Sequence, residues 1–223
     1  MEWTSLKAEH VDSLPITIEP MTWLMSQDEL LEFIGRVARV CYNSSNEPGA
    51  CRRRALSAIS RGHHSPWEHY NVTILSCVDR GTTHALVRHR HCAFQQGSTI
   101  YQKYDENIKV ISLPKMDPTT GKEVPQYTSD VPLLLDATYM MYKRQLNNKV
   151  PTDQARDLLP TDLASNLIIT TNIRQWMYII QRRVGPGDSV RMHVWATMVR
   201  EFFEKQYPDI VKAFDSWYAK HPL

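Results

Sequence analysis

Arginine, histidine and small residues occur together in one segment of the sequence, where they could bind a phosphate. Arg88 and Arg90 flank His89, and a run of small residues from Gly97 to Thr99 follows. Guanidinium groups can bind phosphate oxygens through two parallel hydrogen bonds, and small residues let backbone N–H groups approach an anion closely. The segment could therefore clamp a phosphate or pyrophosphate, or it could form an ordinary charged surface.

Arginines also mark two later segments of the chain. Arg156 lies in one of them, and a helix predicted over residues 172–183 contains the other group. With 3.6 residues per turn, Asn172 and Arg183 would lie about three turns apart on nearly the same face, whereas Arg174 would point elsewhere. One helix could thus present arginines to two ligands or to two subunits.

Histidines are concentrated in one region, since six of the nine fall between His63 and His91. Several of them could converge on a metal ion together with Glu68 or Cys92. The sequence has no H-E-x-x-H motif and no closely spaced cysteine pair, which are typical of zinc sites. We therefore expect no metal site. We expect the four cysteines to be small buried hydrophobic residues without disulfides, at positions Cys41, Cys51, Cys77 and Cys92.

Composition indicates a folded chain of ordinary type. The 223 residues include 42% hydrophobic and 22% charged residues, close to the averages of globular proteins. The formal net charge is only +2, which gives no reason to expect a nucleic-acid or membrane partner. The longest apolar runs are too short to cross a bilayer, and the first residues lack a signal-peptide pattern. These features predict a cytoplasmic protein.

Hydrophobic periodicity predicts the elements that would position these residues. After an irregular start, Ser26 and Glu29 form a predicted capping box at the first helix, and the segment from Tyr70 to Val78 alternates like a strand. Helices around one or two strand runs indicate an α+β fold without internal repeats. Further predicted elements are helices at 51–59, 82–90, 133–146, 172–183, 189–206 and 208–217, a turn at 153–158, a strand at 108–113 and a loop at 114–132.

Four motifs together resemble the flavin-dependent thymidylate synthases. Seven residues separate Arg-His-Arg at 88–90 from Ser98, and Gly-His-x-Ser-Pro-Trp-Glu-His occupies 62–69. Ala-Arg-x-x-Leu-Pro follows at 155–160, and Thr-Asn-x-Arg-x-Trp begins a segment that ends at Arg183. The motifs occur in the family's order over roughly residues 30–205. The resemblance implies a single domain over 1–223, a small mixed or antiparallel sheet packed with long helices, and a homotetramer.

The resemblance also implies an activity. Members of this family methylate dUMP at C5 to give dTMP, with methylenetetrahydrofolate as carbon donor, NADPH as reductant and FAD as the flavin cofactor. Such chemistry needs no cysteine nucleophile, and no base is spaced to activate Ser98. Two alternatives remain open. One is a flavin- and folate-dependent hydroxymethylase, or a methylase acting on another pyrimidine nucleotide such as dCMP, and the other is an inactive flavin-binding relative.

Site residues follow from the same resemblance. The residues that match flavin contacts are His63, Ser65, Glu68, Arg88, His89, Arg90, Asn172 and Arg174. Those that match nucleotide contacts are Arg88, Gln96, Gly97, Ser98, Thr99, Arg156 and Arg183. Arg183 matches the catalytic arginine that favours ionisation of uracil N3. By stabilising negative charge on the ring, it would make C5 a better nucleophile.

Several positions depart from the family pattern. Ile100 stands where many relatives have an arginine, and its apolar side chain removes a charge-assisted contact of roughly 1.5–3 kcal/mol unless another cation such as Lys103, Arg182 or the run 52–54 replaces it. The turn at 185–188 also differs. Further departures are Ala85, Ala93 and Tyr178. These changes leave the fold prediction intact and bear on which nucleotide the protein accepts.

Overall fold

The structure is a computed structural model of the chain. It divides the chain into two compact units, which are described separately. Unit 1 comprises residues 1–17, 76–88 and 95–167, and unit 2 comprises residues 18–75, 89–94 and 168–223. Among the residues described, no helix has the length and hydropathy needed to cross a membrane. The described residues are 11–41, 49–104, 107–112, 115–116, 123–124, 130–185 and 187–223.

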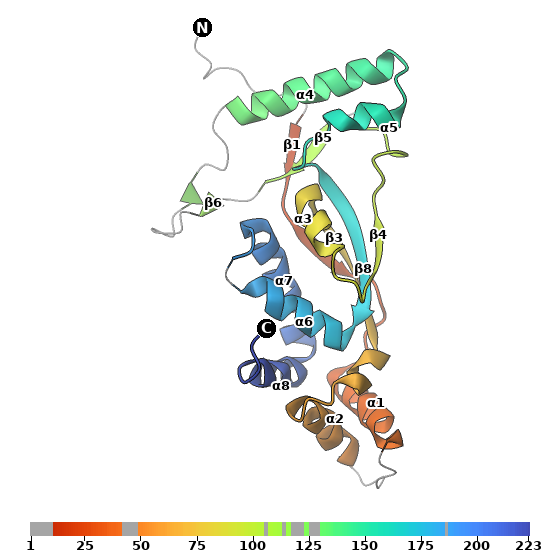
Figure 1. Ribbon diagram of the computed structural model, residues 1–223, viewed down its shortest axis with the longest axis vertical. Coiled ribbons are helices and arrows are strands. Elements are labelled where there is room, and N and C mark those ends of the chain that lie inside the picture. The colour runs from red at the N-terminus through yellow and green to blue at the C-terminus, as the bar shows by residue number, and fades with distance from the viewer. Residues whose placement is uncertain are drawn as a thin grey trace. The chain divides into compact units, whose positions relative to one another are not determined.

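A four-stranded sheet contains the two longest described strands, β3 (Asn71–Asp79) and β8 (Ala164–Asn172). They lie next to each other in the strand order β2-β3-β8-β4, as Figure 1 shows. The outer strands are β2 (Thr17–Pro20) and β4 (Ala93–Gln96). Residues along β3 and β8 alternate between buried and more exposed positions, as expected when side chains point to opposite faces of a sheet.

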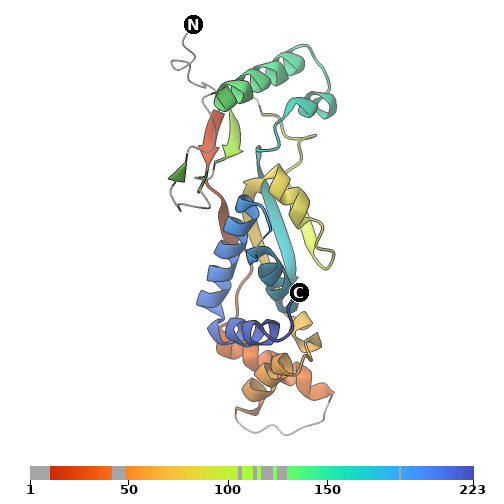
Figure 2. The ribbon, with the colours of Figure 1, turned by 60° about the vertical axis from the view of Figure 1, so that its left-hand side comes forward.

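Unit 1 contains a second, two-stranded sheet in which β1 (Val11–Leu14) runs parallel to β5 (Ile108–Ile111). Figure 2 shows helix α4 (Asp130–Asn147) beside these two strands. The core between them includes Ile108, Leu135, Tyr139 and Tyr142. The remaining elements of unit 1 are α3 (Arg80–Leu86), α5 (Thr152–Ala155), the 3-10 helix η3 (Arg156–Leu158) and the antiparallel pair β6 (Lys115–Met116) and β7 (Glu123–Val124).

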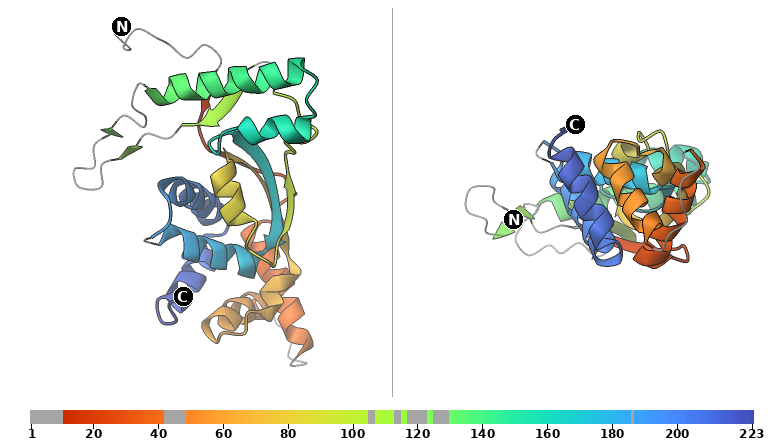
Figure 3. Two further views of the ribbon diagram at one scale, coloured as in Figure 1. Left: turned by 45° about the horizontal axis from the view of Figure 1, so that its top comes forward. Right: turned by 90° about the horizontal axis from the view of Figure 1, so that it is seen from below.

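Unit 2 is mainly helical. Helices α1 (Gln27–Val40) and α2 (Ala50–Ser60) pack against each other, and α6 (Ile173–Val184), α7 (Val190–Gln206) and α8 (Pro208–Tyr218) form a second group (Figure 3). The 3-10 helix η2 (Ser65–His69) precedes β3. The core of unit 2 is rich in fully buried aromatic side chains, which supply large apolar area: Trp67, Trp176, Trp195, Phe203 and Phe214.

The predicted α+β class is confirmed, and several element predictions are too. The capping box is present, since Glu29 N donates to Ser26 Oγ and Ser26 N donates to Glu29 Oε2. The strand predicted at Tyr70 is β3. The helices predicted at 51–59, 133–146, 172–183, 189–206 and 208–217 are α2, α4, α6, α7 and α8, with slightly different bounds.

Other predictions were wrong. The start of the described chain is not irregular, because β1 and β2 lie there, and β8 lies in a region predicted to be largely helical. The helix predicted at 82–90 ends at Leu86, so Arg88 and Arg90 follow it in non-helical backbone. All four cysteines are free, as predicted, but only Cys51 is buried. Cys41 is exposed because it lies at the end of α1, and Cys77 and Cys92 are partly exposed. Most of the loop predicted at 114–132 lies outside the described residues.

Candidate functional site

In unit 2, Arg183 lies at the centre of a group of polar side chains. Its Nε donates to His89 Nε2 at 3.0 Å, and its Nη1 donates to Asp188 Oδ1 at 2.9 Å. The side chains of Arg183 and Asp188 are only 15% and 16% exposed. The guanidinium is therefore held in place from two sides, by an imidazole and by a carboxylate.

His89 can accept this hydrogen bond only while its Nε2 carries no proton. Burial lowers the pKa of His89 to about 4, and the nearby positive charges of Arg183 and Arg182 act in the same direction. The negative charge of Asp188 opposes them. The imidazole is therefore neutral near pH 7, and its ring also meets the Tyr178 ring edge-on, with centroids 6.2 Å apart. The proton of the neutral ring is then on Nδ1.

Local backbone geometry brings Asp188 back toward the end of α6. Gly187 has a φ of +97°, a conformation that glycine adopts without steric cost, and it turns the chain after α6. Ser189 then caps α7, because its side chain accepts a hydrogen bond from Met192 N. Asp188 stands between these two positions and is thereby fixed opposite Arg183.

The start of α6 carries two more predicted site residues. Asn172 is the N-cap, and its Oδ1 accepts from Gln175 N at 2.9 Å. Arg174, two residues further, forms an ion pair with Glu68 of η2. Both partners are about half exposed, so the pair stabilises the fold little and its guanidinium stays accessible. The structure thus brings Glu68 and Arg174 together, as a shared site requires.

The other predicted residues of unit 2 lie on its surface. His63, Ser65 and Arg90 are exposed, and none of them shares a described hydrogen bond with another predicted site residue. Among the described residues, no group of three or more histidine, cysteine or acidic side chains could hold a metal ion.

In unit 1, Arg156 is the cation of a second polar group. Its Nε donates to the Asp153 carbonyl at 3.1 Å, and its Nη1 donates to Thr99 Oγ1 at 3.4 Å. Thr99 is buried, whereas Ser98 accepts hydrogen bonds from the backbone N–H groups of two following residues, Ile100 at 3.2 Å and Tyr101 at 3.4 Å. The predicted nucleotide segment therefore forms a tight turn beside a half-buried guanidinium.

Gln96 and Gly97 anchor the start of this turn. Gln96 Nε2 donates to Thr83 Oγ1 at 2.9 Å and to Ser165 Oγ at 3.3 Å. Gly97 N donates to the Asn166 carbonyl of β8 at 2.9 Å. Because the Gln96 amide makes two of these hydrogen bonds, a ligand contact by that amide would have to compete with them.

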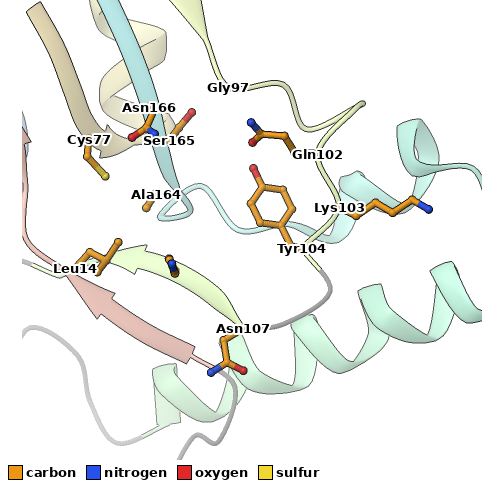
Figure 4. Close-up of a pocket in the computed structure, with 11 residues that line it drawn as sticks. Leu14, Cys77, Gly97, Gln102, Lys103, Tyr104, Asn107, Ala164, Ser165 and Asn166 are labelled. Carbon is orange, nitrogen blue, oxygen red and sulfur yellow. The ribbon is translucent and has the colours of Figure 1, made fainter. Parts of the chain in front are cut away.

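A cavity of about 380 Å³ opens beside the same turn in unit 1. Figure 4 shows Gln102 and Tyr104 extending into it, opposite Asn166 of β8, while Lys103 extends away from it. Gly97 and Lys109 also line it. Burial raises the pKa of Tyr104, so its hydroxyl is neutral near pH 7. The cavity is thus a space of ligand size, with a mixed polar and apolar lining, beside the predicted nucleotide segment.

Arg88 and Ile100 are two further positions named in the sequence predictions. Arg88 is exposed and is the last residue of the 76–88 segment of unit 1. Ile100 is 40% exposed and presents an apolar side chain beside Ser98, which gives no substitute for the missing arginine.

The sequence indicated the turn at 185–188 only as a departure from the family pattern, and it did not identify Asp188 as a partner of Arg183. The signal available was an acidic residue between a glycine and a helix-capping serine, close after two arginines.

The fold and these contacts define an α+β protein with arginine-centred polar groups in both units. Residues 24–209 match the family model described as "Thymidylate synthase complementing protein". The match covers most of the chain, so the protein belongs to this family, the flavin-dependent thymidylate synthases. The family membership that the four motifs indicated is confirmed.

Named relatives agree with this assignment. The chain is 29% identical to the flavin-dependent thymidylate synthase of Corynebacterium diphtheriae, over 85% of this chain and 79% of that protein. It is 31% identical to the probable flavin-dependent thymidylate synthase of Mycobacterium phage L5, over 70% of this chain and 68% of that protein.

Solved structures share the fold. The UMP/dUMP methylase PolB from Streptomyces cacaoi, bound with 5-Br dUMP, matches with a TM-score of 0.72 and 21% identity over 92% of this chain and 97% of that chain. The same methylase bound with 5-Br UMP gives a TM-score of 0.73 over 93% and 97% of the two chains. At this identity the likeness establishes the fold.

Proposed function

We propose that the protein is a flavin-dependent nucleotide methylase that converts dUMP to dTMP, with methylenetetrahydrofolate as carbon donor and NADPH as reductant. Family membership and the names of the relatives support this class of reaction. The observation that carries it is the Arg183 guanidinium, largely buried and held by a neutral His89. A fixed donor of this kind is suited to a pyrimidine ring on which negative charge develops.

In this mechanism Arg183 donates to the uracil ring and stabilises negative charge as C5 attacks the carbon donor. Because its hydrogen bonds to His89 and Asp188 fix the guanidinium beforehand, little reorganisation is needed during the reaction. Arg156 binds the nucleotide as a cation, with the Ser98–Thr99 turn and Arg88 as further phosphate contacts. Gln96 and Gly97 hold that turn on β8.

The flavin would be held by polar groups that suit an anionic pyrophosphate. In unit 2, Arg90 and Arg174 offer exposed guanidiniums, with His63, Ser65, Glu68 and Asn172 as further contacts. His89 uses Nε2 to hold Arg183, so only the rest of its ring is available to the flavin. When bound and reduced, the flavin supplies the hydride that completes the methyl group. We also propose that the protein is a cytoplasmic homotetramer with shared sites.

A second candidate function is the same flavin- and folate-dependent chemistry with altered specificity or outcome. It would be a methylase acting on dCMP, or a hydroxymethylase. Ile100 favours it, because an exposed isoleucine stands where the family pattern has a nucleotide-binding arginine.

Product analysis separates these functions. Purified protein loaded with FAD is incubated with methylenetetrahydrofolate and NADPH, and with dUMP or dCMP. Formation of dTMP supports the proposal, and a methylated or hydroxymethylated cytidine product supports the second candidate. Bound FAD that NADPH reduces, without turnover of either nucleotide, contradicts both and indicates an inactive flavin-binding relative.

Substitution of Arg183 tests the proposed catalytic role. Arg183→Ala should lower turnover of dUMP by at least about a hundredfold, since it removes a donor aimed at developing charge, and should leave FAD bound. Arg61→Ala is the control, because Arg61 is exposed in the same unit and shares no described side-chain hydrogen bond or ion pair with these groups. Turnover and flavin absorbance are measured on all three proteins. Wild-type turnover by Arg183→Ala would disprove the role.

A further inference from the structure

The cavity of unit 1 is not accounted for by the sites proposed above. Its volume of about 380 Å³ falls in the range of small-molecule sites. Of the predicted nucleotide contacts, only Gly97 is among its lining residues. Arg156, the cation of the proposed nucleotide group, is not among them. The cavity therefore adjoins that group without containing its positive charge.

Strand β8 gives the cavity a face of its own. Ala164 and Asn166 line the cavity and belong to the more exposed face of the strand. Ser165, which also borders the cavity, is buried, and its hydroxyl accepts from Gln96 Nε2 at 3.3 Å. Successive side chains of a strand point to opposite faces. A ligand in the cavity could therefore use the face of Ala164 and Asn166 while Gln96 keeps its hydrogen bond.

The lining offers hydrogen-bond donors and a cation. Lys109 of β5 is exposed and lines the cavity. Figure 4 shows the Gln102 amide and the Tyr104 hydroxyl in the cavity, opposite Asn166. Among the described residues, no aspartate or glutamate lines it. Such a lining suits a ligand with negative charge.

Two positive charges act on groups in the cavity wall. Burial raises the pKa of the Cys77 thiol, and the charge of Lys109 opposes this shift. Burial likewise raises the pKa of Tyr104, and the charge of Arg80 opposes it. Cys77 and Tyr104 both line the cavity. The charges of Lys109 and Arg80 are therefore felt at its wall.

Arg80 also has an unused donor. Its backbone N–H donates to the Leu163 carbonyl at 3.1 Å, which holds the residue at the start of α3. Its Nη1 is buried and has no hydrogen-bond partner among the described residues. Buried polar groups are nearly always paired, so an unpaired one calls for a partner such as water or an anion. The guanidinium thus adds to the positive charge on this side of unit 1.

We propose that the cavity binds the anionic end of a small-molecule ligand, with Lys109 as its cation and the amides of Gln102 and Asn166 as hydrogen-bond donors. An ammonium group and carboxamide N–H groups can both donate to the oxygens of a carboxylate or a phosphate. This site is additional to the groups centred on Arg156 and Arg183.

Two reactants could supply this anion, and their choice rests on the proposed function. That function assigns the nucleotide phosphate to Arg156 and the flavin pyrophosphate to guanidiniums of unit 2. The anions that remain are the glutamyl carboxylates of methylenetetrahydrofolate and the phosphates of NADPH. The cavity would hold one of these charged ends.

Calorimetric titration distinguishes the two sources. FAD-loaded protein is titrated separately with 5-formyltetrahydrofolate, a stable analogue of the carbon donor, with NADP⁺ and with dUMP. In Lys109→Gln we expect one of the first two ligands to bind about tenfold more weakly or worse, because a charge-assisted contact is lost. The affinity for dUMP should stay that of wild type. The ligand whose affinity falls is the occupant of the cavity.

Two further variants separate charge from space. Lys103→Gln is the matched control, because Lys103 borders the same cavity but its side chain extends away from it (Figure 4). It should bind all three ligands like wild type. Ala164→Leu keeps Lys109 and fills part of the cavity, so it should weaken the same ligand as Lys109→Gln. Thermal unfolding of each variant checks that it is folded.

Equal affinities of wild type and Lys109→Gln for both 5-formyltetrahydrofolate and NADP⁺ would overturn the proposal. A loss of dUMP affinity alone would also overturn it, because the cavity would then be part of the nucleotide site. Either result leaves the proposed function intact, since product formation by wild type is measured separately. Conversely, a wild type that forms no nucleotide product but binds one ligand through Lys109 would contradict the proposed function and support the anion site.

Discussion

His89 should make the stability of the protein depend on pH. Its folded pKa of about 4 lies below the usual 6.5, so the unfolded chain takes up a proton first as pH falls. The contribution of neutral His89 to the free energy of unfolding is therefore complete above about pH 6.5. This contribution decreases as the pH falls from 6.5 toward 4. We expect the free energy of unfolding of wild type to fall more steeply between pH 7 and pH 5 than that of His89→Gln.

Urea unfolding at several pH values measures this difference. His193→Gln is the control, because His193 is exposed on α7 in the same unit. It should follow the wild-type pH dependence. Identical slopes for wild type and His89→Gln would show that His89 does not control this part of the profile.

At the residue scale, the sequence predicted candidate groups but not their contacts. The motifs identified both His89 and Arg183 as site residues, yet 94 positions separate them. Only folding brings the imidazole against the guanidinium, and no local periodicity encodes that distance. Asp188 could not be assigned from the sequence, because its role depends on the φ of Gly187 and on the cap at Ser189.

At the scale of elements, the contact between α1 and α2 depends on Gly35. A Cβ added at Gly35 would overlap the backbone of Cys51, so the two helices approach closely at this point. Gly35→Ala should lower the free energy of unfolding by roughly 1–3 kcal/mol or more, because backbone atoms cannot move aside as a flexible side chain can. Arg36→Ala is the control, since Arg36 is exposed and its ion pair among the described residues is the i,i+4 pair with Glu32.

Urea or thermal unfolding gives this comparison. The control should lose only a few tenths of a kcal/mol, which is typical of an exposed helical ion pair. Equal stabilities of the two variants would mean that the helices can separate without cost.

Predictability of the strands varied for a physical reason. In β3, Val72 and Ile74 alternate with more polar residues, and this period of two identified the strand. In β8, the run from Ile168 to Thr171 is rich in β-branched residues, a signal for a strand that the helical neighbourhood obscured. Strand β4 has only four residues, so its extended form depends on its place beside β8, which no local pattern shows.

At the scale of the whole molecule, assembly and flavin binding should be linked. A chain of 223 residues is short to enclose a flavin, a nucleotide, a folate and a nicotinamide nucleotide alone, and family resemblance implies sites shared in a homotetramer. Large apolar side chains on the described surface are available for subunit contacts, among them Trp23 at 96% exposed and Tyr101 at 87%.

A ligand that only the assembly binds stabilises that assembly by mass action. We therefore expect a species of four 25.9 kDa chains that carries the flavin absorbance, and loss of both together on dilution. Added FAD should shift dissociation to lower protein concentration, as linkage requires. Sedimentation velocity with detection at a flavin absorption band measures mass and flavin in one experiment, and the same dilution series with excess FAD is the control. Flavin that sediments with a single 25.9 kDa chain would contradict shared sites, because one protomer would then hold the cofactor alone.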